Sequence, residues 1–133
     1  MLIKNKFFYF YLLSLFLYSL NLSADEFDIK AKEIIIDKEN KTILGKGSVE
    51  AVDSQGRVII SDKITYKKSK EFLLAEGNVK IADLEGNILK AAKATYDKKN
   101  EIIVTYDDTE LIMQEGYKLI TQNVSYNIVD RVL

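Results

Sequence analysis

The sequence predicts an all-β protein, an antiparallel up-and-down meander bent into an open, V-shaped trough of two layers. Three observations predict it: a thirty-residue repeat, turn glycines at fixed places in that repeat, and a one-residue slip in the apolar pattern of each unit. A single sheet has one apolar face that must be covered, and a sheet bent over on itself covers its own face.

The repeat is visible in two stretches of the chain. GKGSVEAVDSQGRVIISDKITYK begins at residue 45, and its echo AEGNVKIADLEGNILKAAKATYD begins at residue 75. Self-similarity at a fixed period is typical of stacked supersecondary units. Four columns share the period: Ile36, Tyr66, Tyr96 and Tyr126; Glu26, Gly56, Gly86 and Gly116; Ile43, Leu73, Ile103 and Leu133; Ala31, Ser61, Ala91 and Thr121. The tyrosine column is either an aromatic binding ladder or cross-strand packing near the strand ends, and we favour packing.

The first 24 residues have the three parts of a secretory signal peptide. Lys4 and Lys6 form the basic region, residues 7–20 the apolar region, and Leu22-Ser23-Ala24 the cleavage site. The apolar run of about 14 residues is shorter than the roughly 20 that cross a bilayer. We predict cleavage after Ala24 and one exported domain of residues 25–133; the alternative is an uncleaved anchor.

Each unit of the remaining chain is predicted to form two strands. In one unit the first strand is GRVIISDKITYK (56–67), the polar turn is KSKE (68–71), and the second strand is FLLAEGNVKIAD (72–83). The turns SQG, LEG and QEG end in the repeat glycine, which can adopt the left-handed backbone of a tight turn. We expect about seven strands of about ten residues each, and no helix outside the signal peptide.

The first strand of each unit has its inward-facing residues at a spacing of 2, 3 and 2. A slip of one residue turns side chains to the other face of a sheet unless a bulge absorbs it. The same slip in every unit therefore predicts a bend at one level of all strands. The residues are Ile29, Ala31, Ile34 and Ile36; Ile59, Ser61, Ile64 and Tyr66; Leu89, Ala91, Ala94 and Tyr96; Leu119, Thr121, Val124 and Tyr126.

Composition excludes several classes of function. The chain has no histidine and no cysteine, so Ser-His-Asp and Cys-His nucleophile systems, His-based metal sites and redox CxxC pairs cannot occur. Removing Lys4 and Lys6 from the 19 basic residues leaves 17 against 20 acidic residues, a net charge of −3. Mild, evenly spread charge argues against nucleic acid as a partner. We predict no enzyme activity, no catalytic residue, no metal site and no cofactor.

The sequence resembles the OstA-like N-terminal domain of the lipopolysaccharide transport and assembly family. The matching segments are AEGNV (75–79), the turn DLEG (83–86) and the strand LKAAKATY (89–96), and the resemblance covers residues 27–127. Two matching units in tandem resemble most the N-terminal region of the outer-membrane assembly protein of that family. The third unit departs from the pattern, with DDTEL (107–111) in place of GNVKI.

The resemblance implies an open β-jellyroll in the periplasm of a Gram-negative envelope. It implies lipopolysaccharide as a partner, with the lipid A acyl chains shielded in an apolar groove. It further implies docking to other jellyroll proteins of the transport system by β-strand augmentation, and association with an outer-membrane barrel. The residues expected to line the groove are Ile29, Ile34, Ile36, Val49, Ile59, Ile64, Leu73, Val79, Ile81, Leu89, Ala94, Ile103, Leu111, Leu119 and Val124.

Two alternatives remain open from the sequence. The chain could be a structural or adhesive β-repeat module that binds only protein. At its C-terminus, Leu133 falls in a column that begins strands, so we favour a domain truncated from a longer protein over a natural end with a short edge strand.

Overall fold

The computed structural model of the chain describes residues 27–129. The predicted signal peptide, residues 1–24, lies outside the described residues, as do residues 25–26 and 130–133. The cleavage site and the truncated C-terminus therefore stay predictions.

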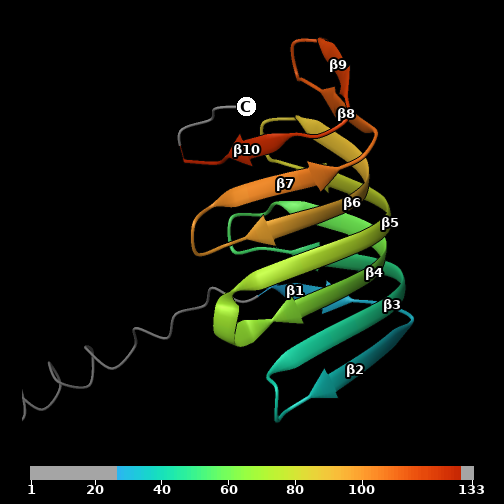
Figure 1. Ribbon diagram of the computed structural model, residues 1–133, viewed down its shortest axis with the longest axis vertical. Coiled ribbons are helices and arrows are strands. Elements are labelled where there is room, and N and C mark those ends of the chain that lie inside the picture. The colour runs from blue at the N-terminus through green and yellow to red at the C-terminus, as the bar shows by residue number, and fades with distance from the viewer. Residues whose placement is uncertain (1–26, 130–133) are drawn as a thin grey trace, which may run out of the picture.

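The described residues form one antiparallel sheet whose strands stack along the long axis of the molecule (Figure 1). The strands are β1 (Asp28–Lys30), β2 (Glu33–Asp37), β3 (Thr42–Val52), β4 (Val58–Lys67), β5 (Phe72–Ala82), β6 (Ile88–Asp97), β7 (Ile102–Tyr106), β8 (Thr109–Ile112), β9 (Lys118–Thr121) and β10 (Ser125–Asn127).

These strands follow seven lines across the molecule, as the repeat predicts. The strands β3, β4, β5 and β6 are continuous and have ten or eleven residues each. The other three lines are interrupted at mid-length, which divides them into β1 with β2, β7 with β8, and β9 with β10. Both halves of the first line pair with β3, and both β7 and β8 pair with β6.

The described residues contain no α-helix, and they include one turn of 3-10 helix. Lys68–Lys70 form a turn of 3-10 helix, η1, between β4 and β5. The turn closes because Glu71 takes a left-handed conformation, with φ of 49°, and its N–H donates to the carbonyl oxygen of Lys68 at 3.2 Å. The sequence shows only a polar turn at this place, so its exact hydrogen-bond pattern was not predictable.

The predicted bend is present at one level of the sheet. Between two paired positions, β3 advances three residues from Lys46 to Val49 while β4 advances two. The same shift separates β5 from β6 between Glu76 and Val79. The extra residue lies in β3 and β5, the second strands of their units, whereas the sequence pattern placed the irregularity in the first strands. The slip in the apolar pattern of β4 and β6 arises because these strands pair with the strands that carry the extra residue.

Left-handed backbone recurs every thirty residues and explains the period of the sequence. Such conformations favour glycine, and Asn and Asp tolerate them best among other residues. At the bend, Ser48 and Asn78 follow a left-handed glycine and are themselves left-handed, with φ of 47° and 48°. Three further columns have positive φ in three repeats each: Lys41, Glu71 and Glu101; Gly47, Gly77 and Asp107; Gly56, Gly86 and Gly116.

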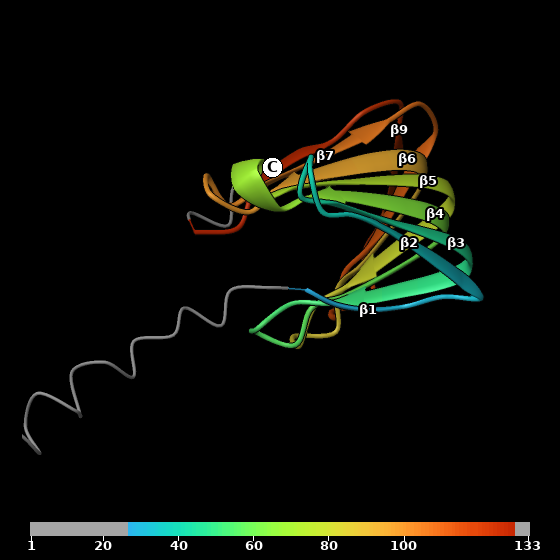
Figure 2. The same ribbon diagram turned by 90° about the horizontal axis from the view of Figure 1, so that it is seen from below.

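The bend divides the sheet into two arms, seen in Figure 2 as the two sides of a V. The glycine-turn arm ends in the turns that contain Gly56, Gly86 and Gly116; it comprises β1, β8, β9 and residues 49–52, 58–61, 79–82 and 88–91 of the long strands. The lysine-turn arm ends in turns 38–41, 68–71 and 98–101; it comprises β2, β7, β10 and residues 42–46, 63–67, 72–76 and 93–97.

The core lies between the inner faces of the two arms. Both arms supply it, and the largest fully buried side chains include Tyr66 and Tyr96. The buried apolar residues are Phe27, Val49, Ala51, Ile59, Ile64, Tyr66, Leu73, Ala75, Val79, Ile81, Leu89, Ala94, Tyr96, Ile103 and Leu111. The V-shaped two-layer architecture predicted from the sequence is thus confirmed.

We expect Gly77→Ala to destabilise the fold more than Gly116→Ala. Both glycines are left-handed, with φ of 82° and 94°, so alanine is strained at either position by about 1 kcal/mol. A Cβ at residue 77 would also lie 2.5 Å from Oδ2 of Asp62, an oxygen that accepts a hydrogen bond from Asn78, whereas a Cβ at residue 116 meets nothing within 4 Å.

Urea unfolding of the two variants and the parent measures this difference. The Gly77→Ala variant should lose at least about 1 kcal/mol more unfolding free energy than Gly116→Ala. Equal losses would mean that the contact between a Cβ at residue 77 and Asp62 does not lower the unfolding free energy.

Candidate functional site

The fifteen residues expected to line the groove fall into three groups. Ten are buried in the core: Val49, Ile59, Ile64, Leu73, Val79, Ile81, Leu89, Ala94, Ile103 and Leu111. Ile29 and Val124 are partly buried and pack against that core. Ile34, Ile36 and Leu119 are exposed, with 44%, 62% and 48% of their surface accessible.

The three exposed residues lie at the two ends of the stack. Ile34 and Ile36 share their repeat columns with the buried Ile64 and Tyr66, and their strand β2 is an edge of the sheet. Leu119 shares its column with the buried Leu89, and its strand β9 is an edge at the other end. Figure 1 shows β2 and β9 at opposite ends of the long axis. These side chains continue the inner apolar face where no further strand covers it.

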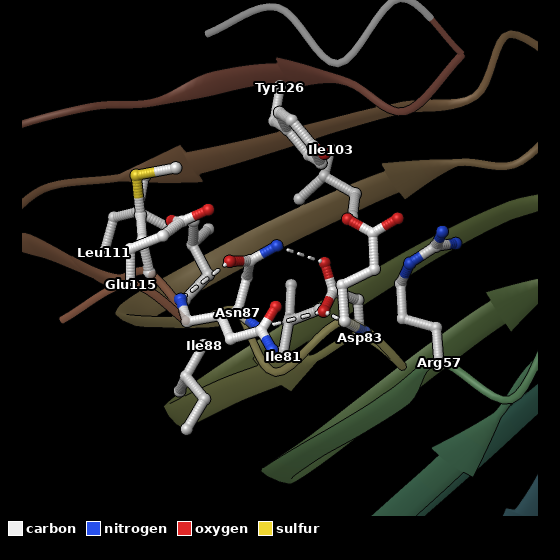
Figure 3. Close-up of a pocket in the computed structure, with 13 residues that line it drawn as sticks. Arg57, Ile81, Asp83, Asn87, Ile88, Ile103, Leu111, Glu115 and Tyr126 are labelled. Atoms are coloured by element: carbon white, nitrogen blue, oxygen red, sulfur yellow. Dashed lines mark hydrogen bonds between the residues drawn. The ribbon is translucent and has the colours of Figure 1, made fainter. Parts of the chain in front are cut away.

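An apolar cavity of about 180 Å³ lies between the arms in the C-terminal half of the trough (Figure 3). Its apolar lining consists of Ile81, Ile88, Leu89, Ile103, Leu111 and Met113. Its polar rim consists of Arg57, Asp83, Glu85, Asn87, Gln114, Glu115 and Tyr126. A cavity of roughly 150 Å³ lined by aliphatic residues binds benzene, so this one fits a short stretch of hydrocarbon chain.

A second hollow, of about 250 Å³, adjoins the mouth of this cavity. It shares Arg57, Asp83, Glu85 and Tyr126 with the cavity, and Leu84 and Ile128 complete its apolar part. The two hollows therefore adjoin along these four residues.

We call the side of the trough opposite the bend, where the turn ends of the two arms face each other, the mouth. In the N-terminal half of the trough, Phe27 closes the mouth. Its ring lies edge-on to the rings of Tyr66 and Tyr96, with centroids 5.0 Å and 5.7 Å away. The ammonium group of Lys98 lies 5.2 Å from the centre of the same ring. Phe27 immediately precedes β1 of the glycine-turn arm, whereas both tyrosines belong to the lysine-turn arm. The aromatic contact therefore joins the two arms.

Arg57 closes the mouth next to Phe27. Its Nη1 donates to Oδ2 of Asp53 at 2.8 Å and to the hydroxyl of Tyr96 at 2.8 Å. The Tyr96 hydroxyl in turn donates to Oε2 of Glu101 at 3.2 Å. Arg57 and Asp53 are only 8% and 6% exposed, so this ion pair is shielded from water. Loss of either oxygen partner would leave the buried guanidinium incompletely paired, which costs free energy. Because one partner, Tyr96, belongs to the opposite arm, this cost keeps the two arms in contact here.

Burial raises the pKa of the Tyr96 hydroxyl well above its ordinary value. Removal of the hydroxyl from water opposes ionisation most strongly; the Arg57 guanidinium acts in the other direction, and the carboxylates of Glu101 and Asp53 reinforce the rise. Tyr96 is therefore a hydrogen-bonding group and not a source of protons at neutral pH.

The sequence reasoning missed Phe27 and Arg57. Both follow a position of the glycine column, and the column one residue later reads Phe27, Arg57, Asn87 and Tyr117. That column contains no shared residue type, so the search for similarity passed over it. The tyrosine column itself proves to be mostly packing, since Tyr66 and Tyr96 are fully buried and Tyr126 is half-buried.

Among residues 27–129, no group of three or more acidic side chains is placed to hold a metal ion. Within the same residues, no helix is both long and apolar enough to cross a membrane.

Comparison with known proteins gives a match in structure. No protein-family model matches the sequence, and no curated protein sequence matches it. The fold is similar to that of LptH, the LptA-homologous periplasmic component of the conserved lipopolysaccharide transport device from Pseudomonas aeruginosa. The TM-score is 0.72 at 13% sequence identity, over 81% of this chain and 80% of LptH. The jellyroll fold implied by the OstA-like motifs is confirmed.

We expect the stability of the parent protein to fall more steeply above pH 10 than that of Tyr96→Phe. The unfolded chain releases the tyrosine proton near its ordinary pKa of 10.0, whereas the folded protein retains it to higher pH. The contribution of Tyr96 is therefore complete below pH 10 and declines above it, with a slope of up to about 1.4 kcal/mol per pH unit.

Urea unfolding of both proteins between about pH 8 and pH 11 measures these slopes. The phenylalanine variant is the matched control because it keeps the ring and removes only the titrating group. Parallel curves for the two proteins would contradict the expectation.

Proposed function

We propose that this chain is a periplasmic lipopolysaccharide-transport module that shields lipid A acyl chains in its trough. The observation that carries the proposal is the aliphatic cavity between the two arms of a sheet with the fold of LptH. The predicted signal peptide is consistent with export to the periplasm.

Hydrocarbon burial is enough to hold such a ligand. Each methylene group moved out of water contributes about 0.8 kcal/mol, so several of them bind without any specific polar contact. The cavity of about 180 Å³ takes only a short stretch of chain. Longer acyl chains require the arms to separate, and the proposed hinge is the bend at Gly47 and Gly77.

The ends of the stack are suited to docking with like modules. Edge strands present unpaired backbone groups that add a further strand readily. At one end β2 exposes Ile34, Ile35 and Ile36, and at the other β9 exposes Leu119 and Ile120. We propose that the lipid passes from module to module along a trough made continuous by these edges, toward the outer membrane and the outer-membrane barrel implied by the resemblance.

The topology fixes the polarity of such a junction. The first line runs from β1 in the glycine-turn arm to β2 in the lysine-turn arm, and the seventh runs likewise from β9 to β10. A head-to-tail junction between two copies therefore places parallel strands side by side. Parallel pairing is slightly weaker per residue than antiparallel pairing, so the exposed apolar side chains would supply much of the binding energy.

A photoreactive amino acid at Met113 is expected to capture lipopolysaccharide in cells, because this side chain lines the cavity. The same residue at Ile60, which is 40% exposed on the outer face, is the control and should capture none. Ile64 and Val79 are less suitable positions, since they are 0% and 2% exposed and a bulky probe there would disturb the core.

Mass analysis of the captured species distinguishes the two functions considered. Capture of lipid by the probe at Met113, and not by the probe at Ile60, supports the transport module. Capture of protein alone, with no lipid at Met113, would refute it and favour the structural or adhesive module that binds only protein.

A lysine at position 36 is expected to abolish self-association of the chain. Ile36 is 62% exposed on the edge strand β2, and a charged residue on an edge blocks strand addition. Ile60→Lys adds the same charge away from both edges and should associate as the parent does. Sedimentation velocity over a range of concentrations gives the result. A parent that stays monomeric, or an Ile36→Lys variant that associates normally, would refute edge docking.

A further inference from the structure

One residue per repeat faces the mouth of the trough, immediately after the turn glycine column. These residues are Phe27, Arg57 and Asn87, each thirty positions after the last. A tyrosine of the opposite arm occurs 39 positions after each of them, namely Tyr66, Tyr96 and Tyr126. The repeat thus places three pairs of residues at equivalent sequence positions on the two sides of the mouth.

The first two pairs are in contact. The rings of Phe27 and Tyr66 lie 5.0 Å apart, and Nη1 of Arg57 donates to the hydroxyl of Tyr96 at 2.8 Å. The Arg57 guanidinium carbon also lies 5.4 Å from the centre of the Tyr96 ring. At these two levels the glycine-turn arm and the lysine-turn arm meet, and the mouth is closed.

The third pair is different because asparagine is short and bonds within its own arm. The Asn87 Nδ2 donates to Oδ2 of Asp83 at 2.9 Å, and its Oδ1 accepts from the backbone N–H of Gln114 at 3.1 Å. Asn87 and Tyr126 instead both line the cavity (Figure 3). The apolar cavity is found at the level where the cross-mouth pair is not made.

We infer that the gap between Asn87 and Tyr126 is a lateral portal through which a hydrocarbon chain enters the trough, and that the size of the residue after the turn glycine decides whether each level is open. The inference rests on the proposed function for the identity of the ligand. The Arg57–Tyr96 pair walls the cavity on its N-terminal side, so a chain reaches the cavity from the mouth without passing the closed levels.

The repeat supplies the variant that tests the portal. In the closed level, Oδ1 of Asp53 accepts from the backbone N–H of Arg57 at 2.9 Å, and Oδ2 holds the guanidinium. In the open level, Oδ1 of Asp83 accepts from the backbone N–H of residue 87 at the same 2.9 Å. In the Asn87→Arg variant, the new guanidinium can therefore pair with Asp83 as Arg57 pairs with Asp53. Tyr126 then takes the place that Tyr96 has in the closed level.

The first measurement needs no ligand. The chain has no cysteine, so Met113→Cys gives a single thiol in the lining of the cavity, and its rate of reaction with a thiol reagent reports access. Asn87→Arg in this background should slow labelling at least about tenfold, because reaction then requires a local opening. Asn87→Ala loses the same Gln114 hydrogen bond and leaves the gap open, so it should label at least as fast as the parent.

Two further variants guard against a merely structural effect. Tyr126→Ala added to Asn87→Arg removes the opposite member of the pair and should restore fast labelling. Should the arginine variant fail to fold, Asn87→Phe copies the Phe27–Tyr66 pair and should slow labelling likewise. Unchanged labelling in whichever of these closing variants folds overturns the inference.

The second measurement follows a fluorescent hexadecanoic acid entering the protein by stopped flow. The parent and Asn87→Ala should bind it, and Asn87→Arg should bind it at least about tenfold more slowly while its urea midpoint stays near that of the parent. A parent that binds no fatty acid overturns both the proposed function and the portal. A parent that binds, with an arginine variant that binds equally fast, overturns the portal alone.

Discussion

Consecutive left-handed residues at the bend, Gly47–Ser48 in β3 and Gly77–Asn78 in β5, are the constraint on which the rest of the structure depends. Each pair inserts one residue into its strand, and the strand turns toward the interior. Because the insertions lie at one level, the whole sheet folds along a single line. Without them, the apolar face of a flat sheet would remain uncovered, and neither the core nor the cavity would exist.

The fold along that line also creates a mouth, and the mouth is where this molecule differs from repeat to repeat. The strands obey the thirty-residue period closely, but the side chains that meet across the mouth do not. Phe27 and Arg57 reach the opposite tyrosines, and Asn87 does not. The trough is therefore asymmetric along the stack, with the apolar lining of its cavity in the C-terminal half.

The two ends of the stack expose the same inner face that the middle strands bury. An inner face that is buried in the middle strands is exposed on β2 at one end and on β9 at the other. The proposed docking of a like module would cover this exposed inner face and extend the trough, since each added strand pair repeats the existing inner columns.

The sequence by itself determined the all-β class, the seven lines of strand and the existence of the bend. Those features follow from local backbone preferences and from the alternation of apolar residues, both of which are written in the chain and repeated at a fixed period. Ten of the fifteen expected lining residues are buried in the core for the same reason.

Only the tertiary structure decided which of those positions are open. Ile34, Ile36 and Leu119 belong to inward-facing columns, yet they are exposed because their strands are the last of the stack. The roles of Phe27 and Arg57 depend on the approach of two arms that are 39 residues apart in the chain at each contact. Contacts of this kind depend on how closely the two arms approach and on which side chains span the mouth, and the repeat period alone specifies neither.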